Sequence, residues 1–266
     1  MAKLTQHKTT RAVKMILMGK SGSGKTGALA SLVQAGYELA ILDFDNGLDF
    51  FASLLSKEES DRVFYVSLRD QMKAVAGKAV VKQVTAAKEM AKYLDNWKDD
   101  DLGPVSSWPL SRILVIDSIT NMAKALFNHV LSVNGRLNQT PYKSDWGNAM
   151  FLVDNYIQLL TAPETPCHVI FMAHVEYLED EYLGIVEGLP VTLGKKLSPK
   201  IGTYFNSTLY VTRKGTGTNT KREIQTIGAD KVECKVATKG VPATLPHATG
   251  LAEYFKLVTG DKCPTQ

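Results

Sequence analysis

The chain of 266 residues carries a formal net charge of +4, with 44% hydrophobic and 22% charged residues. This balance is typical of a globular protein with a sizeable core, and it excludes a disordered or fibrous chain. No apolar run reaches the length of a membrane span, so we expect a cytoplasmic protein without a membrane partner.

One domain between two short ends is the organisation expected along the chain. Residues 1–11 are polar and basic, lack the apolar stretch of a signal peptide and predict a flexible arm. Residues 12–260 form the expected single domain, and residues 261–266 a tail. The cysteines are scattered without a C-x-x-C pair, so we expect reduced thiols rather than a disulfide framework or a metal site. They are Cys167, Cys234 and Cys263.

The first buried strand, expected over residues 13–18, runs directly into a glycine-rich loop. The loop matches the phosphate-loop pattern G-x-x-x-x-G-K-[ST], and an apolar helical segment follows over residues 27–33. Strand, loop and helix in this order place backbone N–H groups and a helix N-terminus around an anion. The expected phosphate-binding residues are Gly19, Lys20, Ser21, Gly22, Ser23, Gly24, Lys25 and Thr26.

Two residues at the end of this loop have distinct expected roles. Lys25 should reach the β- and γ-phosphates of ATP, and the Thr26 hydroxyl should ligate Mg²⁺. The sequence has no N-K-x-D guanine-reading motif, and it leaves the choice between ATP and GTP open. The alternative is a glycine turn that binds nothing.

A second buried strand begins at residue 38 and ends in the acids Asp43 and Asp45. Ligands of open α/β sheets bind at the carboxyl ends of strands, so we expect both carboxylates on the rim that holds the phosphate loop. Asp45 is the expected general base or water-positioning acid for hydrolysis at the γ-phosphate. The alternative role for the two acids is capping of a helix or loop.

The next segments are a strand over residues 62–66 and a long helix over residues 69–98, whose apolar residues recur at helical spacing. Residues 113–116 then form a buried strand that ends in Asp117 and Ser118, the pattern of a Walker B strand. Asp117 should hold Mg²⁺ opposite Thr26.

Two helices, over residues 119–131 and 148–160, are expected to flank a polar loop over residues 132–147. A fourth core strand, residues 168–174, ends in His174. At a strand tip on the nucleotide rim, this histidine is either a phosphate sensor or a structural hydrogen-bonding group.

The last third of the chain predicts a second long loop and then an antiparallel β-meander. The loop covers residues 175–200. The three strands are expected over residues 207–213, 221–226 and 231–237, before a terminal helix over residues 250–258.

This order of motifs resembles the RecA-like ATPase core, and it is most similar to the phage-encoded RecA-like single-strand annealing proteins. The resemblance implies an α/β fold with a mostly parallel central sheet flanked by helices and a C-terminal antiparallel β-meander. It places Asp45 at the position of the family's catalytic glutamate, one methylene shorter. It also places His174 where a glutamine senses the γ-phosphate in that family.

Further site residues follow from the same resemblance. The two long loops correspond to those that line the DNA path of RecA-like filaments, where lysines meet phosphates and aromatic rings stack on bases. Lys239, near the end of the meander, is the expected trans-acting residue that reaches the neighbouring subunit's ATP. The expected DNA-binding residues are Tyr142, Lys143, Trp146, Lys195, Lys196 and Lys200.

The implied function is an ATP-dependent, single-strand DNA-binding recombinase or annealing protein. ATP would lie between protomers of a ring or filament, and DNA would stimulate its hydrolysis. A single-strand DNA-binding protein is a further candidate partner, and a phage-encoded chain would act in the host cytoplasm. The alternatives are a helicase-like or loader ATPase acting on nucleic acid, and a slowly hydrolysing nucleotide-switched DNA-binding module. The scarcity of arginines disfavours a small-molecule kinase, which needs an arginine-rich lid.

Overall fold

The computed structural model of the chain describes residues 12–179, 184, 186–194, 196–215 and 217–260. The predicted arm and tail, residues 1–11 and 261–266, lie outside these residues. None of the helices in the described part of the chain is long and apolar enough to span a bilayer.

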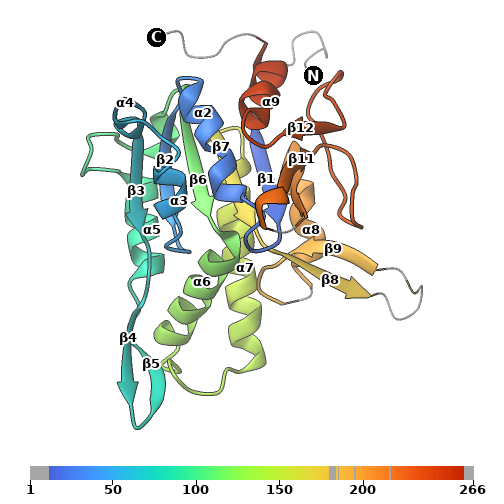
Figure 1. Cartoon of the computed structure of the whole chain (residues 1–266). Coiled ribbons are helices and arrows are strands. Elements are labelled where there is room, and N and C mark those ends of the chain that lie inside the picture. The colour runs from blue at the N-terminus through green and yellow to red at the C-terminus, as the bar shows by residue number, and fades with distance from the viewer. Residues whose placement is uncertain (1–11, 180–183, 185, 195, 216, 261–266) are drawn as a thin grey trace, which may run out of the picture.

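The centre of the molecule is an eight-stranded sheet (Figure 1). Its strands are β1 (Lys14–Gly19), β2 (Glu38–Asp43), β3 (Val63–Ser67), β6 (Arg112–Asp117), β7 (His168–Ala173), β10 (Ser207–Lys214), β11 (Lys221–Gln225) and β12 (Thr244–Pro246). Their order across the sheet is β12-β11-β10-β1-β7-β6-β2-β3. The strands from β10 to β3 are parallel, whereas β11 and β12 are antiparallel. The predicted fold class, a mostly parallel sheet with antiparallel strands at its C-terminal edge, is confirmed.

Helices cover both faces of this sheet. One face carries α1 (Lys25–Ala28), α2 (Ala30–Gln34) and α9 (Gly250–Thr259). The other carries α5 (Ala86–Asp95), α6 (Ile119–Val133), α7 (Lys143–Thr161) and α8 (Ser198–Ile201). Short turns of helix complete the list: α3 (Asp49–Ala52), α4 (Lys57–Ser60) and the 3₁₀ turns Val105–Ser107, Gly202–Tyr204 and Gly217–Asn219.

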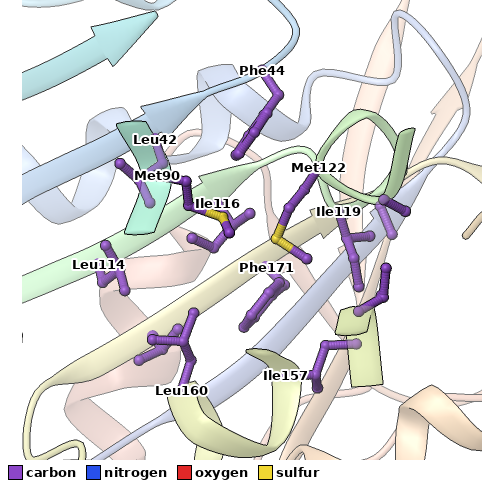
Figure 2. Close-up of a cluster of buried hydrophobic side chains, with 14 of the residues drawn as sticks. Leu42, Phe44, Met90, Leu114, Ile116, Ile119, Met122, Ile157, Leu160 and Phe171 are labelled. Carbon is purple, nitrogen blue, oxygen red and sulfur yellow. The ribbon is translucent and has the colours of Figure 1, made fainter. Parts of the chain in front are cut away.

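Two hydrophobic cores result from this three-layer arrangement, because successive side chains of a strand point to opposite faces. In β6, Leu114 and Ile116 pack towards α6 and α7, while Ile113 and Val115 pack towards the opposite layer. Figure 2 shows the first core, with side chains from the sheet and from α5, α6 and α7 in contact. Each fully buried aliphatic or aromatic side chain contributes about 1.5–3 kcal/mol. This burial fixes the strand ends that build the rim.

The long helix predicted over residues 69–98 is wrong. Its first part is a separate β-hairpin of β4 (Gln71–Val75) and β5 (Lys78–Gln83), and only α5 is helical. Ala76 and Gly77 connect the two strands with φ of 48° and 75°. Positive φ at both central residues is the geometry of a two-residue hairpin turn, and it cannot continue a right-handed helix.

The two predicted long loops are also largely wrong. The first is reduced to residues 134–142, because α6 continues to Val133 and α7 begins at Lys143. The second contains an antiparallel pair, β8 (Val175–Glu179) with β9 (Val186–Pro190), followed by α8.

The C-terminal antiparallel strands differ from the prediction in one member. β10 and β11 lie where two strands were predicted, but the segment 231–237 forms only isolated bridges, such as Thr208 with Lys235. β12 supplies the third strand by pairing with β11.

Candidate nucleotide site

The phosphate loop follows β1 and leads into α1. Gly22 and Gly24 adopt φ of 71° and 103°, a region that strongly favours glycine, and Ser23 N–H donates to Lys20 O at 3.1 Å. The first N–H groups of α1 have no partner inside the helix and face the loop. The loop is therefore shaped as a cradle of backbone donors for an anion.

Strand order places four functional groups on one rim. The neighbours β1, β7, β6 and β2 are parallel, so the phosphate loop, His174, Asp117 and Asp45 all follow their carboxyl ends. The register pairs Asp43 with Asp117. The structure thus brings together the predicted loop, acids and histidine.

Lys25 lies on the floor of the cradle and is 6% exposed. Its Nζ donates to Gly19 O at 3.0 Å and to Lys20 O at 3.4 Å. Burial lowers the pKa of Lys25, while the negative charges of Asp117 and Asp45 oppose that shift. A phosphate oxygen would satisfy this ammonium better than neutral carbonyls do, because charge-assisted hydrogen bonds are stronger.

Thr26 and Asp117 face each other across the rim. Thr26 Oγ1 donates to Asp117 Oδ2 at 2.9 Å, and Asp117 is 2% exposed. Burial and the nearby charge of Asp45 raise the pKa of Asp117 to about 6, although the Thr26 hydrogen bond opposes the shift. A hydroxyl and a buried carboxylate on this spacing fit the oxygen ligands of Mg²⁺, which would also take phosphate oxygens and water.

Asp45 is held by a dense set of hydrogen bonds. Its Oδ1 accepts from Ser118 N at 3.2 Å, Ser118 Oγ at 2.8 Å and Asn121 Nδ2 at 2.8 Å. Its Oδ2 lies 3.2 Å from His174 Nε2. Burial alone would raise the pKa of Asp45, but these hydrogen bonds, led by that of His174, outweigh it and lower the pKa to about 2. The carboxylate is therefore ionised at neutral pH.

Asp43 shapes the turn that presents Asp45. Asp43 Oδ1 accepts from the backbone N–H groups of Asp45 at 3.0 Å and Asn46 at 2.7 Å, and Asn46 has a φ of 56°. This is the Asx-type turn that a short carboxylate supports after a strand. Asp43 therefore caps the loop that follows β2, as the alternative prediction for the two acids had it.

Several residues of the site carry no motif in the sequence. Asn121, one turn into α6, binds Asp45, and its role appears only when α6 is placed against β2. Outside the phosphate loop, His247 Nε2 lies 2.8 Å from Gly24 O. Arg222 packs against Gly24, and its Nε is buried without a hydrogen-bond partner among the described residues. The C-terminal strands therefore support the loop from outside.

The predicted DNA-binding residues do not line a loop beside the nucleotide. Tyr142, Lys143 and Trp146 lie at the start of α7, where Tyr142 contacts the Arg136 guanidinium and the Trp146 ring lies 4.3 Å from that of Phe127.

Arg136 also pairs with the fully buried Asp145, which closes the α6–α7 turn. Lys196 and Lys200 are exposed near α8, and Lys195 lies outside the described residues.

Lys239 is exposed in the segment between β11 and β12, and among the described residues no hydrogen bond or ion pair joins it to the rim of its own chain. Its predicted action on a neighbouring subunit stays a prediction. Cys167 and Cys234 are free thiols, and Cys263 lies outside the described residues. Within the described residues no group of three or more His, Cys, Asp or Glu side chains could hold a metal ion. Thr26 and Asp117 would hold Mg²⁺ chiefly together with phosphates.

The comparison with protein families agrees with a nucleotide site. The family model described as an AAA domain matches residues 11–236, most of the chain. A search of curated proteins found no match. A solved structure, a KaiC-like protein of the hyperthermophilic archaeon Pyrococcus horikoshii, is similar with a TM-score of 0.42 and 13% identity, over 80% of this chain and 78% of that one. On the family match, the chain belongs to the AAA domain family and is an AAA-type nucleotide-binding ATPase.

Proposed function

We propose that the protein binds single-stranded DNA in an ATP-dependent manner and acts in recombination or strand annealing. The observation that carries the nucleotide part is two sets of contacts that lie together on the rim: Lys25 to His174 and His174 to Asp45, and beside them Thr26 to Asp117. They bring together a phosphate-binding lysine, a sensor candidate and two acids with different pKa values. Neighbouring acids whose pKa values differ in this way are typical of active sites in which each acid has a different chemical role.

Each group has a defined part in the proposed hydrolysis. Lys25 and the loop N–H groups hold the β- and γ-phosphates, and Thr26 and Asp117 hold Mg²⁺, which supplies charge neutralisation when bound. Asp45, ionised at neutral pH, orients the water that attacks the γ-phosphorus as ADP leaves. His174 lies between Lys25 and Asp45 and reports the state of the γ-phosphate.

Assembly is the second part of the proposal. ATP is placed between protomers of a ring or filament, and Lys239 completes the neighbouring site. Exposure of Lys239 on the described surface supports this placement. Electron microscopy of the protein with ATP and single-stranded DNA tests it, since a monomer under those conditions contradicts the shared site.

A slowly hydrolysing nucleotide switch is a second candidate, and the geometry of Asp45 favours it. Three donors already bind Asp45 Oδ1, and His174 lies against Oδ2. A catalytic water must displace or share one of these partners. Turnover with and without single-stranded DNA separates the candidates, because a DNA-stimulated enzyme accelerates and a switch does not.

DNA affinity under different nucleotides tests the proposed function as a whole. We expect tight binding of an oligo(dT) probe with a non-hydrolysable ATP analogue and weaker binding with ADP; equal affinities contradict the coupling. Lys25→Ala should abolish nucleotide binding, and Lys57→Ala, a change at an exposed lysine on α4, is the matched control. Joining of two complementary strands without unwinding of a forked duplex favours annealing over a helicase-like role.

A further inference from the structure

The β4–β5 hairpin is the segment that the nucleotide site leaves unexplained. It forms its own two-stranded sheet and extends away from the central sheet at the lower left of Figure 1. All five residues of β4 are exposed, including Met72 at 57% and Val75 at 46%. An isolated two-stranded hairpin is marginally stable in water, so its retention in this fold calls for a reason.

The charged side chains of the hairpin are all of one sign. Residues 71–83 contain Lys73, Lys78 and Lys82 and no acidic residue. The register places Lys73 opposite Val80 and Val75 opposite Lys78. Cross-strand partners and every second residue share a face, so Lys73 and Lys78 project from the same side of the ribbon. The register shifts between Gln71 and Met72, which pair with Gln83 and Val81, so Lys82 is the extra residue of a β-bulge without a cross-strand partner.

The three lysines are distributed over both strands of the ribbon. Lys73 lies opposite Val80, and Lys78 lies opposite Val75, two residues further along β4. All three lysines are exposed, so they offer separate ammonium groups to the phosphates of one strand.

The hairpin is fixed at its base. Asp70 Oδ1 accepts from the N–H groups of Thr85 at 3.0 Å and Ala86 at 3.1 Å, which closes the neck. Asp70 Oδ2 accepts from Asn128 Nδ2 of α6 at 2.8 Å. The lysines are therefore carried on an oriented arm rather than on a loose loop.

A second attachment joins the arm to the α6–α7 turn. The Asn138 side chain accepts from Val81 N–H and donates to Val81 O, each at 2.8 Å, as a neighbouring strand would. This turn leads into Tyr142, which is 63% exposed, and Trp146, which is 41% exposed. Lysines for phosphates and aromatic rings for bases thus lie on adjoining elements, the combination that single-strand binding surfaces use.

The same elements reach the nucleotide site. α6 binds Asp45 through Asn121 near its first turn and the hairpin neck through Asn128. The residue before the neck, Leu68, follows β3, and its N–H donates to Asp43 O at 2.7 Å. A movement of the acids on the rim can therefore reach the hairpin through two connections, one through α6 and one through the segment after β3.

We propose that the β4–β5 hairpin is the arm that binds single-stranded DNA, with Lys73, Lys78 and Lys82 on its phosphates and the α6–α7 turn beside the bases. This rests on the proposed function and assigns its DNA contact to a segment other than the two loops expected from the sequence. The occupant follows from charge, because a hairpin with three exposed lysines and no acid complements a polyanion.

Replacing the three lysines together tests the assignment. In Lys73→Gln/Lys78→Gln/Lys82→Gln the hairpin keeps its exposed strands, and ATP binding should match the wild type. Counterion release predicts that three lost phosphate contacts lower the slope of log K against log salt by about 2, which is on the order of 100-fold weaker oligo(dT) binding at 0.1 M salt. Fluorescence anisotropy with the ATP analogue from 0.05 to 0.5 M salt (about a tenfold range) measures both quantities.

The matched control removes three exposed lysines elsewhere, in Lys57→Gln/Lys88→Gln/Lys98→Gln, with the same change in net charge. It should keep the wild-type affinity within about threefold and the wild-type slope. If both triple variants lose the same amount of affinity for oligo(dT), the loss reflects net charge in general and the assignment of the hairpin as the DNA-binding arm is wrong.

If the triple lysine variant of the hairpin binds single-stranded DNA as tightly as the wild type does, the assignment of the hairpin as the DNA-binding arm is wrong and the proposed function stands. A wild-type protein that binds no single-stranded DNA overturns both. Retained DNA binding combined with loss of self-association in the hairpin variant also overturns the arm and makes the hairpin a contact between copies.

Discussion

His174 Nε2 lies 3.2 Å from Asp45 Oδ2, so the ends of two strands separated by β6 in the sheet meet through one imidazole. The other ring nitrogen, Nδ1, lies 3.4 Å from Lys25 Nζ. A neutral ring that donates from Nε2 to the carboxylate and accepts at Nδ1 from the ammonium satisfies both neighbours. A γ-phosphate that takes over Lys25 removes one of these partners, so the ring can respond to the nucleotide.

His174→Ala should uncouple DNA binding from the nucleotide. Without the ring, no hydrogen-bonded route among the described residues connects the Lys25 ammonium to Asp45. The ratio of DNA dissociation constants in ADP and in the ATP analogue should therefore fall to about 1, while ATP binding stays within a few-fold. His174→Gln is the matched variant, because its amide can donate to Asp45 and accept from Lys25. A wild-type ratio in His174→Ala would show that the histidine is structural.

Asp45→Asn should lower ATP turnover by about 10²- to 10³-fold without abolishing ATP binding. The amide keeps the size of the side chain but loses the charge that orients and deprotonates water. Steady-state phosphate release and a fluorescent nucleotide titration measure the two effects. Asp61→Asn, at an exposed carboxylate after α4, should behave as the wild type. Unchanged turnover in Asp45→Asn places the base elsewhere.

Gly24→Ala should prevent nucleotide binding by distorting the loop. A Cβ at this position would lie 2.6 Å from His247 Nε2 and 2.8 Å from Arg222 Cδ, and the φ of 103° is unfavourable for alanine. Isothermal titration with MgATP should show at least a tenfold loss of affinity. Gly202→Ala is the control, since a Cβ there meets nothing within 4 Å. Wild-type affinity in Gly24→Ala would mean that the loop tolerates a side chain.

The rim could be predicted from sequence because its signals are local. Each parallel strand buried on both faces is an apolar run, and each functional group follows directly at its carboxyl end: the loop after β1, Asp117 at the end of β6 and His174 after β7. Strand order alone then collects them on one edge.

The features that could not be predicted depend on long-range contacts or on positive backbone φ angles. Met72, Ala76 and Val80 recur at helical spacing, which led to the prediction of a helix. In the structure, Ala76 and Gly77 have positive φ and reverse the chain, so Met72 and Val80 lie on two paired strands. Gly77 inside the presumed helix was the available signal. Asn121 has no such signal, because its partner Asp45 lies 76 residues away in sequence.

Stability should fall on acidification because of His168. Its Nδ1 accepts from Val13 N–H at 2.8 Å, and the residue is 1% exposed. Burial, helped by the charge of Lys14, lowers the pKa of His168 from 6.5 to about 3. Because the unfolded chain binds the proton first, the stabilisation is complete above about pH 6.5 and is lost as the pH falls towards 3, by up to about 1.4 kcal/mol per pH unit.

Urea unfolding between about pH 7 and pH 4.5 measures this effect, in a window above the usual pKa of carboxylates. His168→Gln removes the titrating group, so its free energy of unfolding should depend less on pH than that of the wild type, although it is lower at neutral pH. Parallel pH profiles for the two proteins would assign the acid sensitivity to other groups.

Asn138→Gly should loosen the hairpin without straining the turn. Asn138 has a φ of 64°, which glycine adopts freely, so the substitution removes only the two side-chain hydrogen bonds to Val81. Each contributes about 1 kcal/mol, so hydrogen exchange at the Val81 amide should accelerate about tenfold or more.

DNA affinity of Asn138→Gly should fall by a smaller factor than in the triple lysine variant, with an unchanged salt slope because the lysines remain. Asp101→Gly, at another exposed residue of positive φ (54°), controls for the added glycine. Faster exchange with unchanged DNA affinity would mean that the arm binds DNA in any orientation, and the contact with the α6–α7 turn would then serve stability alone.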